Sequence, residues 1–335
     1  MTAKMQQTKV AVIGSGSWAT AIVKILLHNV ERVGWWVREE PIALHLKKYR
    51  HNPSYLTSVK FDINRLFVSN DVNKVVNEAE IIVFCIPAAF LDVSINGLKK
   101  EFLQNKIIIS AIKGIVPDTN EIISDYFNNK YQVQYKNFAV VSGPSHAEEV
   151  AREKLTYLTV ASLNQAVARS VSGLFACQFI KTSISDDIIG TEYAPVIKNI
   201  IAIASGLCCG LGYGDNFQAV LISNALKEIN NLLEVIHPNN RNIKDSVYLG
   251  DLLVTCYSEF SRNRKFGQLL AQGYNPKYAQ IKMNQVAEGY YATKCIKAIT
   301  PGHQVKTPIV DAIYNILYQN KRPSDEMRLL ENKLS

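Results

Sequence analysis

The sequence predicts an α/β protein in which a doubly wound, Rossmann-type sheet domain is followed by an all-α domain. Over the first half of the chain, short continuous apolar runs alternate with helix-length segments, whereas long stretches with helical spacing dominate after about residue 190. The length of 335 residues also exceeds the size at which a single hydrophobic core usually keeps growing. We therefore expect two domains, a Rossmann-type sheet domain at 1–190 and an all-helical domain at 191–335.

Seven apolar runs in the first domain have the length of buried strands. Because they are apolar without alternation, they indicate a sheet that is covered on both faces, as in parallel strands joined by helices. The runs lie at residues 9–14, 32–37, 80–87, 106–112, 137–144, 155–162 and 179–185. Helices are expected in the segments between them, for example at 118–128 and 164–176.

A glycine pattern follows the first run directly. Gly14, Gly16 and Ala19 have the spacing G-x-G-x-x-A at the start of an expected helix. Gly14 permits a tight turn, Gly16 lets the backbone approach a pyrophosphate, and Ala19 lets the helix pack close to the sheet. The first N–H groups of that helix would face the phosphates. A plain glycine turn is the alternative, but the position in a strand-helix-strand unit favours dinucleotide binding.

The end of the second run bears on the choice of dinucleotide. An NAD-selective site usually has an acidic residue there for the ribose 2′-hydroxyl, whereas this chain has Arg38, which suits a 2′-phosphate. Glu39 and Glu40 follow at once, so Arg38 could equally be a surface residue paired with either. We expect NADP or NAD as the cofactor, with NADPH slightly favoured.

The second half is predicted to be helical at 192–206, 216–237, 245–258, 264–272, 284–299 and 308–319. In the first of these stretches, the helical neighbours of Lys198 include Ala194 and Ile201, which cannot pair with an ammonium. Lys198 therefore either extends its charge to water or is a desolvated lysine with a lowered pKa, suited to acid-base chemistry. Pro195 is expected to place the start of this helix within about four residues before it.

The composition narrows the class of partner. The chain is 47% hydrophobic and 20% charged with a formal net charge of +8, and its basic residues are scattered without a nucleic-acid motif. This charge fits either steering of a phosphorylated substrate or dinucleotide, or a solvated basic surface without a partner. No apolar run approaches the roughly 20 residues that span a bilayer, so we expect no membrane segment and a cytoplasmic location.

The six cysteines lie in apolar segments, and none forms a CxxC pair. They are interpreted as core residues rather than as disulfides or a zinc site, and no metal is expected. They are Cys85, Cys177, Cys208, Cys209, Cys256 and Cys295.

Seven segments between residue 9 and about residue 290 resemble a known family. They read GSGSWATAI, NPSYL, SAIKGIVPDT, SGPSHAEEVA, IKNIIAIASGL, GYGDNFQAVLI and YLGDLLVTCYSEFSRNRKFGQLLAQG. In this order they are similar to the NAD(P)-dependent glycerol-3-phosphate dehydrogenases of the bacterial type. The resemblance implies reversible hydride transfer between nicotinamide and C2 of the substrate, which interconverts dihydroxyacetone phosphate and glycerol 3-phosphate, a phospholipid precursor. It implies a small phosphorylated three-carbon substrate and leaves a homodimer open.

The resemblance also implies roles for individual residues. Lys198 matches the proton acceptor, and the catalytic residues are Lys198, Lys113 and Asp251. The implied substrate contacts are Lys113, Gly143, Ser145, Lys198, Asp251, Ser261, Arg262 and Asn263. The implied cofactor contacts are Gly14, Gly16, Ser17, Trp18, Arg38, Lys113, Ala147, Arg262, Val286 and Glu288.

General chemistry is consistent with these roles. Ketone reduction needs a proton donor beside the carbonyl, and a desolvated ammonium can serve as one. A terminal phosphate needs charge-assisted donors, which Arg262 and its neighbours can supply. Each residue also has a structural alternative: Asp251 as a helix cap, Arg262 as a surface cation and Lys113 as a lysine extending from a strand end.

Two departures from the family pattern stand out. The family usually has a glycine-rich run before the lysine at 198, where this chain reads TEYAPV, and it commonly has an arginine at the position of Asn224. Two other functions are therefore kept open. One is a related dehydrogenase acting on another phosphorylated or carboxylated hydroxy compound, and the other is a non-catalytic dinucleotide-binding sensor.

Overall fold

A computed structural model describes residues 7–283, 286–300 and 305–335. The chain forms two compact units, of which the first comprises Met1–Ile112 and Ile123–Ile188, and the second comprises Lys113–Ile122 and Ile189–Ser335. The expected division at residue 190 differs from this in one main respect, because Lys113–Ile122 pack with the second unit. Ile115 and Ile122 belong to the hydrophobic core of that unit, which explains why the segment leaves the first one.

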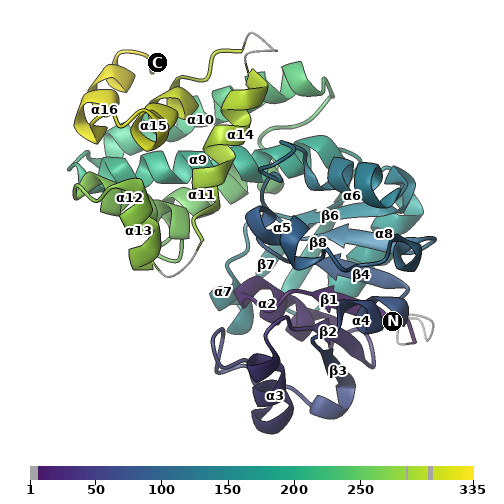
Figure 1. Ribbon diagram of the computed structural model, residues 1–335. Coiled ribbons are helices and arrows are strands. Elements are labelled where there is room, and N and C mark those ends of the chain that lie inside the picture. The colour runs from purple at the N-terminus through teal and green to yellow at the C-terminus, as the bar shows by residue number, and fades with distance from the viewer. Residues whose placement is uncertain (1–6, 284–285, 301–304) are drawn as a thin grey trace. The chain divides into compact units, whose positions relative to one another are not determined.

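The first unit contains one eight-stranded sheet of order β3-β2-β1-β4-β5-β6-β7-β8, with helices around it (Figure 1). Its strands are β1 (Val10–Ile13), β2 (Val33–Trp36), β3 (Leu66–Ser69), β4 (Ile81–Phe84), β5 (Ile107–Ser110), β6 (Phe138–Ser142), β7 (Thr156–Ala161) and β8 (Ile180–Ser185). Neighbouring strands run parallel except β6 and β7, which are antiparallel. The strand order reverses between β1 and β4, so the carboxyl end of β1 is the place where doubly wound folds bind ligands.

Strand β3 is absent from the sequence prediction. It has only four residues and pairs through Val33↔Leu66 at one edge of the sheet. Its continuous apolar run covers only Leu66, Phe67 and Val68, which is shorter than the runs that predicted the other strands.

The helices of the first unit are α2 (Ser17–Leu26), α3 (Glu40–Tyr49), α4 (Val72–Asn77), α5 (Ala88–Ser94), α6 (Ile123–Tyr131), α7 (Ala147–Ala151) and α8 (Gln165–Phe175). The expected helix at 118–128 starts late, because the chain first closes a turn. Val116 N–H donates to the Glu121 carbonyl at 2.9 Å, and Asn120 has a left-handed backbone with φ of 56°. A helix cannot continue through that conformation.

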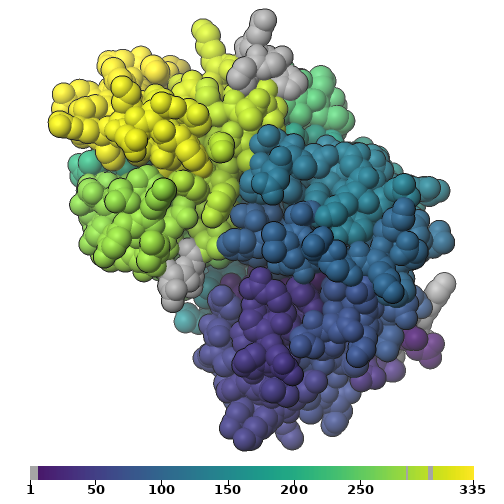
Figure 2. Space-filling model, in the orientation of Figure 1, coloured from purple at the N-terminus to yellow at the C-terminus, as the bar shows by residue number. Residues whose placement is uncertain are grey.

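The second unit is helical among its described residues. Its helices are α9 (Ile188–Gly210), α10 (Asp215–Ile236), α11 (Asp251–Tyr257), α12 (Arg262–Ala271), α13 (Pro276–Met283), α14 (Glu288–Ile299), α15 (Pro308–Tyr318) and α16 (Pro323–Glu331). A π-helical turn, Ser246–Gly250, leads directly into α11. Figure 2 shows α15 and α16, in yellow, lying together at the surface of this unit. Residues 284 and 285 of the expected helix at 284–299 lie outside the described residues.

Two helices of this unit, α13 and α16, are absent from the sequence prediction. In α13 only Ala279 is buried, so the segment has no apolar stripe. Helix α16 is nine residues long and begins with Pro323, and its short run of buried side chains does not stand out in the sequence.

The prediction that helix α9 begins within about four residues before Pro195 is wrong. The helix begins at Ile188 and continues through Pro195, which lies in its interior. Proline at that position removes one backbone hydrogen bond, to the carbonyl of residue 191, at a cost of about 3 kcal/mol. Burial offsets this cost: α9 has a mean hydropathy of 1.4 over an 18-residue window that is 89% buried within the fold. This helix is long and apolar enough to cross a membrane by composition, yet it is packed as a core helix.

Glycines let α9 approach the helices that cross it. A Cβ on Gly206 would lie 2.0 Å from the Arg264 carbonyl oxygen, and a Cβ on Gly267 would lie 2.1 Å from that of Ile203. At Gly289 the clash would be with the Asn199 carbonyl oxygen, at 2.5 Å. These contacts bring α12 and α14 against the part of α9 that follows Lys198.

Candidate active site

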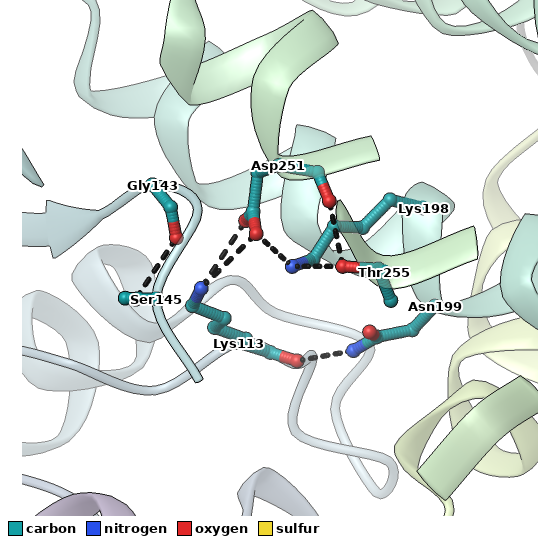
Figure 3. Close-up of polar contacts among 7 residues, drawn as sticks. All are labelled: Lys113, Gly143, Ser145, Lys198, Asn199, Asp251 and Thr255. Atoms are coloured by element: carbon teal, nitrogen blue, oxygen red, sulfur yellow. Dashed lines mark hydrogen bonds and ion pairs between the residues drawn. The ribbon is translucent and has the colours of Figure 1, made fainter. Parts of the chain in front are cut away.

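Two lysines and an aspartate form a charged cluster in the second unit (Figure 3). Lys198 projects from α9 and its Nζ lies 2.5 Å from Oδ1 of Asp251, the first residue of α11. Lys113, which follows β5, lies on the other carboxylate oxygen, with Nζ 3.2 Å from Oδ2. The cluster thus joins three segments that are far apart in the sequence, and all three predicted catalytic residues belong to it.

Burial sets the charge of this cluster. The side chains of Lys198 and Asp251 are 6% and 2% exposed, and that of Lys113 is 20% exposed. Desolvation lowers the pKa of Lys198 to about 7, with the Asp251 charge opposing the shift and the Lys113 charge adding to it. Burial also opposes ionisation of Asp251, but the charges of Lys113 and Lys198 outweigh it and hold the pKa of that carboxyl below its usual value. Lys198 therefore does not extend its charge to water, and it can exchange a proton near neutral pH.

Thr255 fixes the direction of the Lys198 ammonium. Lys198 Nζ donates to Thr255 Oγ1 at 2.9 Å, and this hydroxyl donates in turn to the Asp251 carbonyl at 2.6 Å. Sequence reasoning missed Thr255, although its position one helical turn after Asp251 places both residues on one face of α11.

Asn199 is a second residue that sequence reasoning missed. Its Nδ2 donates to the Lys113 carbonyl at 3.1 Å, so α9 holds the backbone of Lys113, while Asp251 of α11 holds its side chain. In the sequence, Asn199 is notable only as the neighbour of Lys198, and nothing there indicates that it binds the backbone of Lys113.

The three residues Ser261, Arg262 and Asn263 begin α12. Ser261 is its buried N-cap and accepts a hydrogen bond from Arg264 N–H at 3.2 Å, while Arg262 is exposed. Asn263 is buried, and its Oδ1 accepts from Gly289 N–H at 2.9 Å near the start of α14. Asn263 therefore ties α12 to α14, a role that its expected substrate contact did not indicate.

In the first unit, the expected substrate residues Gly143 and Ser145 lie just after β6. Gly143 has φ of 129°, and a Cβ there would lie 2.8 Å from the Tyr157 carbonyl oxygen, so only glycine fits. Ser145 Oγ donates to the Gly143 carbonyl at 2.9 Å (Figure 3). Ala147 is buried at the start of α7.

The glycine loop after β1 is shaped for a dinucleotide. Gly14 has φ of 135° and would place a Cβ 2.2 Å from the Cys85 carbonyl oxygen, whereas a Cβ on Gly16 would meet nothing within 4 Å. No side chain caps the N-terminus of α2, and its first turn, which begins with Ser17, contains no acidic residue. The indole N–H of Trp18 is buried without a hydrogen-bond partner among the described residues. The backbone N–H groups at the uncapped start of α2 and the Trp18 indole N–H lie around the open Gly16. Together they fit the phosphates of a nicotinamide dinucleotide.

At the end of β2, Arg38 forms an ion pair with Glu39. Its Nε and Nη2 donate to Glu39 Oε1 at 3.0 and 2.6 Å, and Glu39 Oε2 accepts from the Ser15 hydroxyl at 3.1 Å. Although partial burial works against its charge, the hydrogen bonds from Arg38 and its neighbours keep the pKa of Glu39 below the usual value. An ionised carboxylate therefore lies beside the glycine loop, one residue later in the chain than the usual acidic position.

Val286 and Glu288, which the family resemblance implies as cofactor contacts, lie in the second unit. Both are half-buried, Glu288 as the first residue of α14 and Val286 just before its N-cap, Ala287. Two cysteines depart from the expected core positions: Cys209, near the end of α9, is exposed, and Cys177 is half-buried. Among residues 7–283, 286–300 and 305–335, no three His, Cys, Asp or Glu side chains are grouped to hold a metal ion.

Asn224, the second departure from the family pattern, lies on the exposed face of α10. Its side chain forms hydrogen bonds with the backbone of Ser335, at 2.9 Å to the carbonyl oxygen and 3.2 Å from the N–H. In the second unit it therefore packs against the end of the chain.

Comparison with known proteins extends over nearly the whole chain. Residues 9–168 match the N-terminal domain, and residues 187–328 the C-terminal domain, of the family described as NAD-dependent glycerol-3-phosphate dehydrogenase. A relative from Staphylococcus aureus named glycerol-3-phosphate dehydrogenase [NAD(P)+] is 33% identical over 314 residues, which is 93% of this chain and 94% of the relative.

Solved structures agree with this similarity. The glycerol-3-phosphate dehydrogenase of Coxiella burnetii superimposes with a TM-score of 0.90 at 28% identity, covering 96% of this chain and 98% of that one. The glycerol-3-phosphate dehydrogenase of Saccharomyces cerevisiae has a TM-score of 0.78 at 25% identity, covering 97% and 99% of the two chains.

Proposed function

The chain belongs to the NAD-dependent glycerol-3-phosphate dehydrogenase family, and we propose that it interconverts dihydroxyacetone phosphate and sn-glycerol 3-phosphate through the Lys113–Asp251–Lys198 cluster. It is an oxidoreductase that uses NAD(P). The observation that carries the proposed mechanism is the buried Lys198, whose pKa of about 7 suits proton exchange at neutral pH.

In the reducing direction, Lys198 donates the proton. When bound, a reduced nicotinamide would supply hydride to C2 of the ketone. The ammonium of Lys198 gives its proton to the carbonyl oxygen, which becomes the C2 hydroxyl. In the reverse direction the neutral amine accepts that proton. Asp251 and Thr255 hold Lys198 in place, and the second cation, Lys113, stabilises negative charge that develops on the substrate oxygens.

The substrate phosphate is assigned to the start of α12. Arg262 is exposed there and can reach a ligand, and the N-terminus of this ten-residue helix adds a favourable dipole for an anion. Ser261 and Asn263 support this turn through the hydrogen bonds described above. Gly143 and Ser145 are proposed as further substrate contacts.

The cofactor is assigned to the glycine loop and its surroundings. The first unit thus binds the dinucleotide, and the second contributes most of the substrate residues. The residues proposed to contact the cofactor are Gly14, Gly16, Ser17, Trp18, Arg38, Lys113, Ala147, Arg262, Val286 and Glu288. We further propose that the enzyme acts in the cytoplasm, where its product supplies phospholipid synthesis, and that it forms a homodimer.

The test is oxidation of NADPH and NADH by the purified protein with dihydroxyacetone phosphate. We expect turnover that depends on this substrate, together with little activity on unphosphorylated dihydroxyacetone or on carboxylated hydroxy compounds. Cofactor binding without turnover on any of these would support the non-catalytic sensor instead, and turnover on another substrate of the panel would support the related dehydrogenase.

A further inference from the structure

The chain has an acidic residue beside its glycine loop that no sequence pattern assigned to the cofactor. Glu39 ends the connection from β2 to α3, and one carboxylate oxygen accepts from the hydroxyl of Ser15, which lies between Gly14 and Gly16. Ser15 is itself held, because its carbonyl accepts from Asn52 Nδ2 at 2.9 Å. The carboxylate is thus fixed to the part of the loop that approaches the cofactor phosphates.

In doubly wound folds, the adenosine ribose lies at the end of the second strand, where an acidic side chain accepts from its 2′-hydroxyl. Each carboxylate oxygen has two lone pairs, so Glu39 Oε2 can accept a ribose hydroxyl in addition to the Ser15 hydroxyl. Its side chain is 37% exposed and therefore accessible to such a ligand.

Arg38 is the residue that would favour a 2′-phosphate, but Glu39 already holds its guanidinium by two hydrogen bonds. A 2′-phosphate would have to draw Arg38 away from Glu39 and would then lie close to the uncovered carboxylate. The ion pair itself is exposed and cheap to break. The repulsion between two neighbouring anions is the larger obstacle.

We propose that Glu39 determines the cofactor preference of this enzyme, by accepting from the ribose 2′-hydroxyl of NAD(H) and by opposing the 2′-phosphate of NADP(H). This inference rests on the proposed function for its setting and reverses the preference for NADPH that Arg38 alone suggests. In this proposal Arg38 allows NADP(H) to bind but does not make it the preferred cofactor.

The test measures binding to the full-length protein without substrate. The ligands are NADH and NADPH, followed by adenosine 5′-monophosphate and adenosine 2′,5′-bisphosphate, a pair that differs only in the 2′-phosphate. Glu39→Gln keeps the size of the side chain but removes its charge, and Glu40→Gln removes an exposed charge one residue away as the matched control. Arg38→Met tests the opposite partner.

We expect Glu39→Gln to shift the ratio of dissociation constants at least about tenfold toward NADPH, because a charge repulsion is removed and a hydrogen bond to NADH is weakened. The adenosine pair should shift in the same direction, and Glu40→Gln should change neither ratio by more than about twofold. Arg38→Met should weaken NADPH more than NADH. An unchanged ratio would overturn the proposal. If both affinities fell equally, Glu39 would only support the loop. Because only binding is measured, this test of Glu39 remains valid even if the protein does not catalyse the proposed reaction.

Discussion

The ammonium of Lys198 lies 2.5 Å from the carboxylate of Asp251, and both side chains are almost completely buried. A buried ion pair of this kind normally favours the charged form of both partners, yet the pKa of Lys198 is lowered to about 7. Desolvation of the buried ammonium exceeds its attraction to Asp251, and repulsion by the Lys113 charge adds to the shift. The aspartate therefore keeps its charge, and the lysine is the member that gives up a proton.

Replacing Lys198 by methionine should lower turnover with dihydroxyacetone phosphate by at least about a hundredfold, the usual contribution of an acid-base group. The fold should persist, because Asp251 keeps Lys113 as its partner at 3.2 Å. Steady-state kinetics and NADH binding check this prediction. Lys297→Met, which breaks a half-exposed ion pair with Asp311 in the same unit, is the control and should leave turnover nearly unchanged. Wild-type turnover in Lys198→Met would exclude the proposed role.

The two directions of the reaction should respond oppositely to pH. Reduction needs the ammonium form of Lys198, so its kcat/KM should be highest below pH 7 and fall as pH rises through about 7. Oxidation of glycerol 3-phosphate needs the neutral amine and should rise through the same region. Pre-steady-state rates in both directions measure this. Parallel profiles in the two directions would contradict proton transfer by Lys198.

The same pKa predicts an effect on stability. The folded pKa of about 7 lies below the ordinary 10.5, so the unfolded chain binds more protons between these values. The contribution of Lys198 to the free energy of unfolding should therefore increase as pH rises from about 7 to about 10. Comparing denaturation midpoints of the wild type and Lys198→Met across this range isolates the contribution, which should be missing from the variant.

Thr255 is predicted to position Lys198 rather than to contact the reacting atoms. Thr255→Val keeps the shape but removes the acceptor at 2.9 Å, so turnover should fall by about tenfold and the pH midpoint should move down. Thr255→Ser should restore both. A loss of activity in Thr255→Val with an unmoved midpoint would indicate a structural role only.

Arg262→Met should weaken apparent affinity for dihydroxyacetone phosphate by about 10- to 100-fold, the scale of a charge-assisted hydrogen bond. The poorer reaction with unphosphorylated dihydroxyacetone should change little. Lysine at this position should restore only part of the loss, because an ammonium lacks the planar fork. Equal losses for both substrates would show that Arg262 is structural and would direct the search for the phosphate site to Lys113.

Much of this architecture can be read from local sequence. Continuous apolar runs identified seven strands, because a strand buried on both faces needs apolar residues throughout. The glycine loop was equally readable, since Gly14 adopts a backbone conformation that other residues avoid. Lys198 was conspicuous because nothing beside it in the helix could pair with its charge. The sequence did not predict edge strand β3, whose apolar run is only three residues long, or helix α13, in which only Ala279 is buried.

Local sequence predicts the fold class, the glycine loop and a lysine at position 198 without a partner on its own helix, because each depends on neighbours within a few positions. Which charged side chains pair with one another follows from the tertiary structure. The partners of Lys198 and Lys113 come from α11, and the helix through Pro195 persists because its surroundings bury it. Glu39 acquires its place beside the loop in the same way, through hydrogen bonds from Ser15 and Arg38. Desolvation and pairing act over distances in space rather than along the chain, so the pKa of Lys198 and the setting of Glu39 follow from packing.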